Sequence, residues 1–165
     1  MSNLALESGL AALELARRST LAFLEDLSGD KLFHQTAPGT NHAVWIMGHL
    51  GVTDDFFLSS VGGQEPKCPQ EWNKMFGMGS QPTTNPKDYP PPSKIRDNLN
   101  DRRRELIAWF KSMDADKLAS PLPKEWHEFA PTHAALICSV AWHEGLHAGQ
   151  LTLIRRSLGL SPKLG

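Results

Sequence analysis

Apolar residues recur at spacings of three and four along four segments of the chain, which is the period of a helix with one buried face. These segments cover about 3–27, 41–61, 93–113 and 131–158. Turn residues end three of them, at Ser28-Gly29-Asp30, at Gly62-Gly63 and at Gly159. Few runs alternate in the β-branched and aromatic residues that strands prefer. The pattern therefore predicts an all-α fold, a four-helix bundle.

The same pattern predicts helix starts and buried faces. Thr40 or Asn41 would cap the second helix, and Ser93 would cap the third after three prolines. The three tryptophans in helical segments, Trp45, Trp109 and Trp142, are expected in the core. The residues predicted to share buried faces are Leu13, Ala16, Thr20, Phe23 and Leu27; Trp45, His49, Val52 and Phe56; Ile95, Leu99, Arg102, Leu106, Trp109 and Met113; and Leu136, Val140, His143, His147, Leu151, Ile154 and Leu158.

One connection is long for a simple bundle. The stretch 63–92, between the second and third helices, is rich in Pro, Gly and Asn, and its segment 71–76 is expected to form a short helix. Simple up-down bundles use short loops, so this stretch predicts a crossover or a lid over a site. Four of its residues would cap a pocket or form a dimer contact: Trp72, Met75, Phe76 and Met78. A second irregular stretch is expected at 118–130.

Composition narrows the class of protein. The 165 residues suit one domain, 1–165, with 40% hydrophobic and 21% charged residues. The net charge of −1 gives no reason to expect nucleic acid or an anionic membrane as partner. Neither a signal segment nor an apolar run long enough for a bilayer is present. We therefore expect a soluble, cytoplasmic protein. The one basic run, Arg102-Arg103-Arg104, is expected to be a solvated helix face apart from Arg102.

The two cysteines are far apart and do not suggest a disulfide. Cys138 lies in an apolar helical stretch and is expected to pack as a small core residue. Cys68 lies in a proline-flanked loop and would be a nucleophile only if its pKa were lowered.

Three of the seven histidines are candidate metal ligands. His143 and His147 are four residues apart, so a helix projects both from one face. His49 lies on the predicted buried face of the second helix. Left unpaired in a core, each imidazole would carry a desolvation cost of roughly 1–3 kcal/mol, and a shared metal would remove it. Three imidazoles suit one divalent transition metal such as Zn, Ni, Co or Fe, and leave coordination positions open.

Other readings of the histidines stay open. A buried neutral histidine is often only hydrogen-bonded, and we expect that role for His34, His42, His127 and His133. The segment from His143 to His147 formally matches H-E-x-x-H, where the Glu is the general base of a metalloprotease. No His or Glu follows His147, so a third ligand downstream is missing.

Three polar neighbours of these histidines also need a role. Glu144 is interpreted as a solvated or outer-sphere carboxylate rather than a base. Gln150 is interpreted as a helix-packing or dimer residue. Arg102 lies on an apolar face, where it either reaches solvent or points into the metal cavity and binds an anionic substrate group. A fourth metal ligand from Asp54 or Asp55 has little support.

Two motifs carry a resemblance to a known family. The segment 41–50 reads NHAVWIMGHL and the segment 143–151 reads HEGLHAGQL. Together with their separation and the chain length, they resemble the second-helix and fourth-helix signatures of the DinB-like (damage-inducible) superfamily. The resemblance implies a four-helix bundle with a long crossover between helices 2 and 3, and a metal held at the positions of His49, His143 and His147. It also implies a homodimer.

The resemblance extends to possible activities. Enzymes related to this superfamily include thiol-dependent S-transferases and a mycothiol-dependent maleylpyruvate isomerase. Our first hypothesis is therefore a metal-dependent transferase, with zinc or nickel favoured, that uses a low-molecular-weight thiol and a small-molecule substrate. The alternatives are a non-enzymatic metal- or small-molecule-binding dimer linked to stress response, and a metal-dependent hydrolase. The sequence identifies no catalytic residue beyond the ligands.

Overall fold

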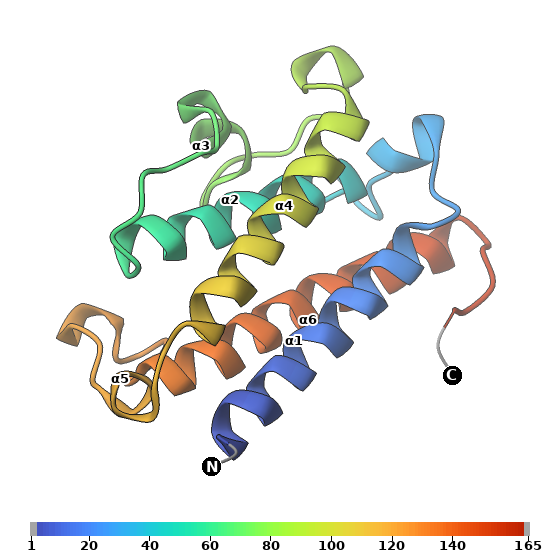
Figure 1. Ribbon diagram of the computed structural model, residues 1–165. Coiled ribbons are helices and arrows are strands. Elements are labelled where there is room, and N and C mark those ends of the chain that lie inside the picture. Colours follow the sequence, from blue (N-terminus) through green and yellow to red (C-terminus); the bar gives the residue numbers. More distant parts are fainter. Residues whose placement is uncertain (1–2, 164–165) are drawn as a thin grey trace.

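The computed structural model describes residues 3–163 as a helical bundle (Figure 1). Within that range there is no strand, and three short 3₁₀ turns lie at Gly29–Phe33, Pro86–Asp88 and Lys124–Trp126. The α-helices are α1 (Leu4–Leu24), α2 (Ala43–Ser60), α3 (Gln70–Phe76), α4 (Pro92–Lys111), α5 (Ala115–Ala119) and α6 (His133–Ser157). Four of them are long, so the predicted all-α four-helix bundle is confirmed, and so is the short helix in the second connection.

The long helices form two parallel pairs. Helix α1 lies along α6, and α2 lies along α4 (Figure 1). Arg17 contacts Glu144 while Phe23, further along α1, contacts Arg155, so α1 and α6 run in the same direction. In the other pair, Gly51 of α2 lies beside Asn98 of α4, and Asp54, further along α2, binds Arg103, further along α4. Helices α2 and α4 therefore also run in the same direction. The direction of α2 is opposite to that of α1 (Figure 1).

This arrangement explains the long connection. Helix α2 has 18 residues, which is about 27 Å at a rise of about 1.5 Å per residue. A parallel neighbour must begin at the same end, so the chain has to return over this length before α4 starts. Residues 61–91 make that return and contain α3. The predicted crossover is therefore confirmed, and it is packed rather than loose, since Trp72 and Phe76 are buried.

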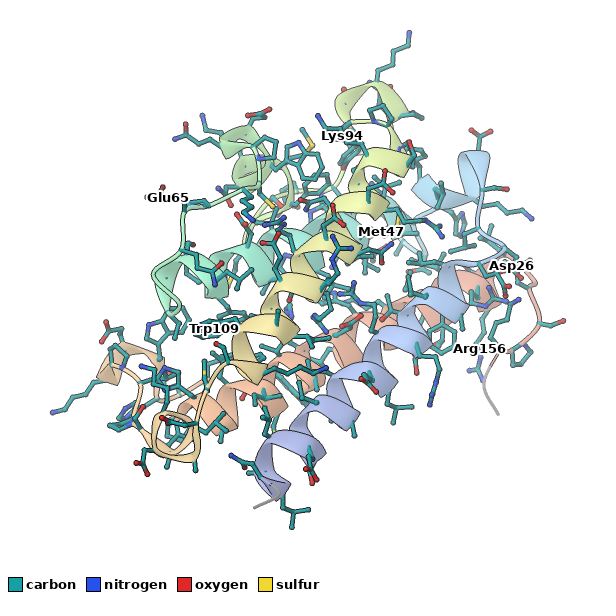
Figure 2. The ribbon with its side chains drawn as sticks, in the orientation of Figure 1. Asp26, Met47, Glu65, Lys94, Trp109 and Arg156 are labelled. Atoms are coloured by element: carbon teal, nitrogen blue, oxygen red, sulfur yellow. The ribbon has the colours of Figure 1, made fainter. Side chains whose placement is uncertain are left out.

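The interior is filled by apolar faces of the four long helices. Met47 of α2 is fully buried and lies among the helices in Figure 2, whereas Glu65 and Arg156 project from the periphery. One cluster of buried residues lies beneath the crossover and includes Ile46 and Leu99. A second lies towards the other end and includes Leu106.

Two predicted caps are wrong. The Nδ1 atom of His42, not Thr40 or Asn41, accepts the Trp45 backbone N–H at the start of α2. Helix α4 begins after Pro91 with Pro92 in its first turn and no side-chain cap, so Ser93 is inside the helix. Proline suits that position because it lacks the N–H that a cap would satisfy.

Several predicted burials are also wrong. The side chains of Phe56 and Trp142 are 49% and 60% exposed, although both lie in apolar helical stretches. Cys138 is exposed, and Cys68 is buried; both thiols are free, as expected. In the basic run, Arg103 is buried together with Arg102 rather than solvated. A single apolar stripe therefore does not define the buried face of these helices: Arg103 of α4 is buried, whereas Phe56 of α2 and Trp142 of α6 are exposed.

Within residues 3–163, none of the helices combines the length and the apolar character needed to cross a membrane.

Candidate metal centre

The structure brings the three candidate histidines together across the two helix pairs. His49 comes from α2, and His143 and His147 come from α6. The Nε2 atom of His143 lies 3.1 Å from Nε2 of His49 and 3.2 Å from Nε2 of His147. One ligand atom from each of the three lies within 4.8 Å of the other two. Three ring nitrogens therefore face one point between α2 and α6.

Protons alone do not satisfy these nitrogens. The Phe76 carbonyl can only accept a hydrogen bond, so His49 donates its Nδ1–H to it, at 2.8 Å, and keeps a lone pair on Nε2. His147 donates its Nδ1–H to Oε1 of Gln150, at 3.1 Å, and also keeps a lone pair on Nε2. His143 carries at most one proton on Nε2. That proton can be donated to the Nε2 lone pair of either His49 or His147, and the other lone pair then faces Nε2 of His143 without a proton between them. A cation satisfies all three at once.

The spacing of the nitrogens also suits a metal ion. Metal–nitrogen bonds of about 2.0–2.1 Å place two tetrahedral ligands about 3.3 Å apart. The observed separations of 3.1 and 3.2 Å are close to this value. Imidazole is a ligand that zinc, nickel, cobalt and iron share. The donor set and its geometry thus fit the group that the sequence predicts.

The electrostatic surroundings keep the imidazoles in the neutral form that binds metals. Burial lowers the pKa of His143 to about 3, with further lowering by the charges of His147, His49 and Arg103. Burial, and then the charge of His49, lowers the pKa of His147 to about 4. Burial also lowers the pKa of His49, although its bond to Phe76 opposes the effect.

The same face of α2 holds the crossover in place. His49 donates to the Phe76 carbonyl, and Nε1 of Trp45 donates to Oγ of Ser80 at 2.8 Å. His42 accepts the N-cap bond at Nδ1, so its Nε2–H donates to the Thr83 carbonyl, at 2.8 Å. Three ring N–H groups at helical spacing therefore bind successive points of the crossover. His42, for which no special role was expected, anchors this loop as well as capping α2.

Trp45 also supports the histidine cluster directly. Its ring stacks on His49 with centroids 4.6 Å apart and an angle of 10° between the planes. The second-helix motif therefore does three things: it supplies one candidate ligand, stacks on it and fixes the loop that orients it.

A buried cluster of four charges lies behind the histidines, with one member from each long helix. Arg103 binds Asp54 through two bonds of 2.8 and 2.9 Å, and it reaches Oε2 of Glu144 at 2.5 Å. Arg17 binds Oε1 of Glu144 at 2.7 Å. Burial alone would raise the pKa of Glu144, but the charges of Arg103 and Arg17 outweigh it and lower that pKa. We call Arg17, Asp54, Arg103 and Glu144 the charge tetrad.

The tetrad corrects the interpretation of Glu144. This side chain is fully buried instead of solvated, and each of its oxygens is paired with an arginine. A carboxylate held in that way does not take a proton from a water near the histidines. Sequence reasoning missed Arg17 and Arg103 because their partners lie on other helices.

Arg102 lies in a different set of contacts. Its guanidinium binds both oxygens of Glu105, at 2.9 and 3.0 Å, and approaches Asp55 at 3.5 Å. The contacts found for Arg102 within residues 3–163 include none of the three histidines. Asp55 in turn accepts the backbone N–H of Cys68. Arg102 is therefore buried and held by carboxylates of α2 and α4.

Cys68 does not meet the condition set for a nucleophile. Burial raises the pKa of its thiol to about 12, although a bond with Asn98 acts the other way. The remaining histidines have ordinary partners, as expected. His34 bonds Ser157, His127 bonds the Leu122 carbonyl, and His133 bonds Ser120.

Comparison with known proteins identifies the family of the chain. The sequence profile of the DinB superfamily matches residues 12–151. The chain belongs to the DinB superfamily. A search of curated proteins gives no match. Among solved structures, the chain is similar in fold to one described as the conserved protein of locus from Enterococcus faecalis, with a TM-score of 0.61 and 19% identity over 94% of this chain and 96% of that one.

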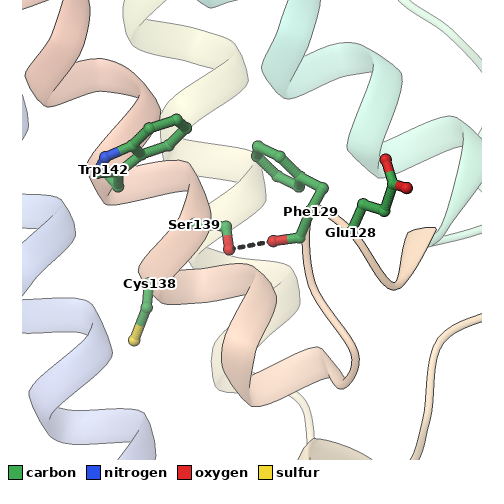
Figure 3. Close-up of a pocket in the computed structure, with 5 residues that line it drawn as sticks. All are labelled: Glu128, Phe129, Cys138, Ser139 and Trp142. Atoms are coloured by element: carbon green, nitrogen blue, oxygen red, sulfur yellow. Dashed lines mark hydrogen bonds between the residues drawn. The ribbon is translucent and has the colours of Figure 1, made fainter.

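In this DinB protein, an aromatic groove lies between the loop before α6 and the residues of α6 that precede His143. It has a volume of about 590 Å³ and is lined by Glu128, Phe129, Cys138, Ser139 and Trp142. Figure 3 shows the rings of Phe129 and Trp142 on one side of α6 and Cys138 pointing to the other. Ser139 donates to the Phe129 carbonyl at 2.6 Å and so holds this loop against α6.

Proposed function

We propose that this protein is a metal-dependent enzyme of the thiol-dependent transferase type. In this proposal His49, His143 and His147 hold one divalent transition metal, and zinc and nickel are the favoured metals. The observation that carries the proposal is the convergence of three Nε2 atoms that protons cannot satisfy together. Three protein ligands leave coordination positions open, which is the pattern of catalytic rather than structural metal sites. The related S-transferases supply the reaction class.

The chain's own residues have defined parts in this proposal. The three imidazoles hold the metal, and the Phe76 carbonyl and Trp45 fix the plane of His49. A metal bound there would lower the pKa of a thiol or water in an open position, so that it is nucleophilic at neutral pH. The paired Glu144 argues against the hydrolase alternative, since it leaves the H-E-x-x-H match without its base.

Metal content tests the first part of the proposal. Elemental analysis of purified protein should give about one metal per chain. His143→Ala and His147→Ala should each lose it, and His34→Ala, outside the cluster, should keep it. Stoichiometric metal in both cluster variants would contradict the proposed ligand set.

Thiol binding tests the second part. In cobalt-substituted protein, a thiol that enters an open position should add a sulfur-to-metal charge-transfer band. Bacillithiol, mycothiol, glutathione and coenzyme A would be compared, and each thiol that binds would be assayed for transfer to model electrophiles. Binding without turnover would favour the non-enzymatic alternative. Neither binding nor turnover, in protein with its metal, would contradict a thiol transferase.

We further propose a homodimer and a cytoplasmic location. Helix α6 exposes Leu146 and Leu153, which are 50% and 56% accessible, and a second copy of the chain would cover them. Light scattering should give twice the chain mass, and Leu146→Glu with Leu153→Glu should halve it. Leu4→Glu, on an exposed residue of α1, is the matched control. A monomer for the unmodified protein would contradict this assembly.

The proposed cytoplasmic location is supported by the two free thiols, which suit a reducing compartment.

A further inference from the structure

We propose that Gln150 and Asn41 are positioning residues that fix His147 as its Nδ1–H tautomer and so direct its Nε2 lone pair at the other two histidines. The inference deepens the proposed function, because the purpose of this tautomer rests on metal binding there. Neither residue touches the point where the three Nε2 atoms meet. They act through His147.

One oxygen connects the two residues to the candidate site. Oε1 of Gln150 lies 3.1 Å from Nδ1 of His147. The same oxygen accepts a hydrogen bond from Nδ2 of Asn41, also at 3.1 Å. Gln150 is one turn after His147 on α6, whereas Asn41 precedes α2 in the chain. The contact therefore joins the beginning of the second-helix motif to the end of the fourth-helix motif.

Asn41 decides which end of the Gln150 amide faces His147. An amide can present either its oxygen or its NH₂ group to a neighbour. Because Asn41 donates, Gln150 must present its oxygen, and that oxygen then requires a proton on Nδ1 of His147. With Nδ1 protonated, the neutral ring has its lone pair on Nε2, the atom that faces His143.

The arrangement matches that of His49 on the opposite helix. There the acceptor is a backbone carbonyl, which cannot be reversed. At His147 the acceptor is a side chain, so a second side chain is needed to fix its orientation. Partners of this kind set the tautomer and orientation of metal-binding histidines, and their loss typically costs 10–100-fold in metal affinity.

The tautomer can be measured without metal. In ¹⁵N-histidine-labelled, metal-free protein, two-bond nitrogen–proton correlations distinguish Nδ1–H from Nε2–H rings, and the His147→Asn variant assigns the signal. We expect His147 to be Nδ1–H. Gln150→Leu should give a mixture of tautomers, and Gln150→Glu, which keeps an acceptor, should restore Nδ1–H. Gln81→Leu, at an exposed glutamine of the crossover, should change nothing.

Asn41→Asp gives a result that loss of packing would not. A carboxylate offers Gln150 only acceptors, so the amide should turn its NH₂ group towards both neighbours. His147 must then accept at Nδ1 and carry its proton on Nε2. We expect the signal to reverse to Nε2–H, whereas general loosening of the region would only mix the two forms.

Metal affinity is the second arm of the test. By competition with a chelator, zinc should bind Gln150→Leu about 10–100-fold more weakly than the unmodified protein, and Gln150→Glu and Gln81→Leu should bind within a few-fold of it. An unchanged Nδ1–H signal in Gln150→Leu and Asn41→Asp would overturn the inference. If the tautomers change as expected but the unmodified protein binds no metal, the positioning role stands and the proposed function fails.

Discussion

At the scale of single residues, neighbours in the chain differ sharply in their surroundings. Arg103 is buried and binds Asp54 and Glu144, whereas the side chain of Arg104 is 73% exposed and pairs with Asp101. Both belong to one basic run that looks uniform in the sequence. The difference arises because Arg103 faces the other three long helices, and it makes the two arginines a matched pair for experiment.

Arg103→Leu should lower the free energy of unfolding by about 3–5 kcal/mol, because it leaves Asp54 and Glu144 buried with an uncompensated charge. Arg104→Leu should change it by less than about 1 kcal/mol, since an exposed ion pair contributes little. Urea unfolding of the two variants gives both values. Equal effects of the two substitutions would show that the charge tetrad does not stabilise the fold.

The two cysteines should differ in reactivity for a similar reason. Cys138 is exposed, whereas Cys68 is buried and burial raises its pKa to about 12. A disulfide reagent at neutral pH should therefore modify one thiol quickly in the native protein and the second only on unfolding. Cys138→Ser should remove the fast phase and Cys68→Ser should keep it. A fast phase in Cys138→Ser would contradict the burial of Cys68.

The sequence predicted some of these residues and missed others for a physical reason. Helical period identified the face that carries His49, His143 and His147, because a face depends on local geometry alone. The partners of Arg103 and Glu144 depend on how four helices pack, and no local pattern contains that information. The period also placed Phe56 in the core, although it is exposed, since the period registers apolar residues and not whether another helix covers them.

At the scale of elements, the crossover is part of the candidate site. Its Phe76 carbonyl orients His49, and Ser80 and Thr83 bind the same face of α2. Composition and length predicted both the crossover and its short helix. The hydrogen bonds that attach the crossover to α2 were not predicted. Two of their three acceptors are backbone carbonyls, and every residue type has one. A long polar stretch of sequence therefore predicts a loop even where hydrogen bonds fix it to a helix.

Gly48→Ala should disturb this attachment. A Cβ atom at Gly48 would lie 2.4 Å from Cδ1 of Phe76, so the buried ring must move together with the carbonyl that binds His49. Overpacking of this kind typically costs about 1–3 kcal/mol. We expect a lower midpoint in urea and weaker zinc binding in the same variant.

Gly145→Ala is the matched control in α6. Nothing lies within 4 Å of a Cβ atom built there, and alanine in a helix is favoured over glycine by about 0.5–1 kcal/mol. That variant should therefore be more stable, with unchanged zinc binding. If Gly48→Ala behaves like Gly145→Ala, the contact between α2 and Phe76 is not tight.

At the scale of the whole molecule, the candidate ligands join the two helix pairs. His49 belongs to the α2–α4 pair, and His143 and His147 belong to the α1–α6 pair. A ligand set that spans both pairs exists only when the bundle is assembled, so the state of these histidines is coupled to global folding. The family resemblance implied ligands from the second and fourth helices, whereas the pairing of the helices was not predicted, because single-helix periodicity does not contain it.

That coupling predicts how the metal-free protein responds to acid. In the folded state the pKa of His143 is about 3 and that of His147 about 4, against about 6.5 in the unfolded chain. Between pH 6.5 and about 4 the unfolded state therefore binds more protons, and the free energy of unfolding falls as the pH falls. Each such imidazole contributes up to about 1.4 kcal/mol per pH unit.

Urea unfolding at several pH values, in the presence of a chelator, measures this slope. His143→Asn removes one titrating ring and should flatten the profile between pH 6.5 and about 4, because fewer protons then distinguish the two states. His42 and His133 also have pKa values lowered by burial, so a residual slope of the same sign should remain in the variant. An identical profile for His143→Asn and the unmodified protein would mean that the ring of His143 protonates as readily in the bundle as in water. The fold would then not hold the three histidines in the neutral form. A metal ion would have to displace their protons when it binds.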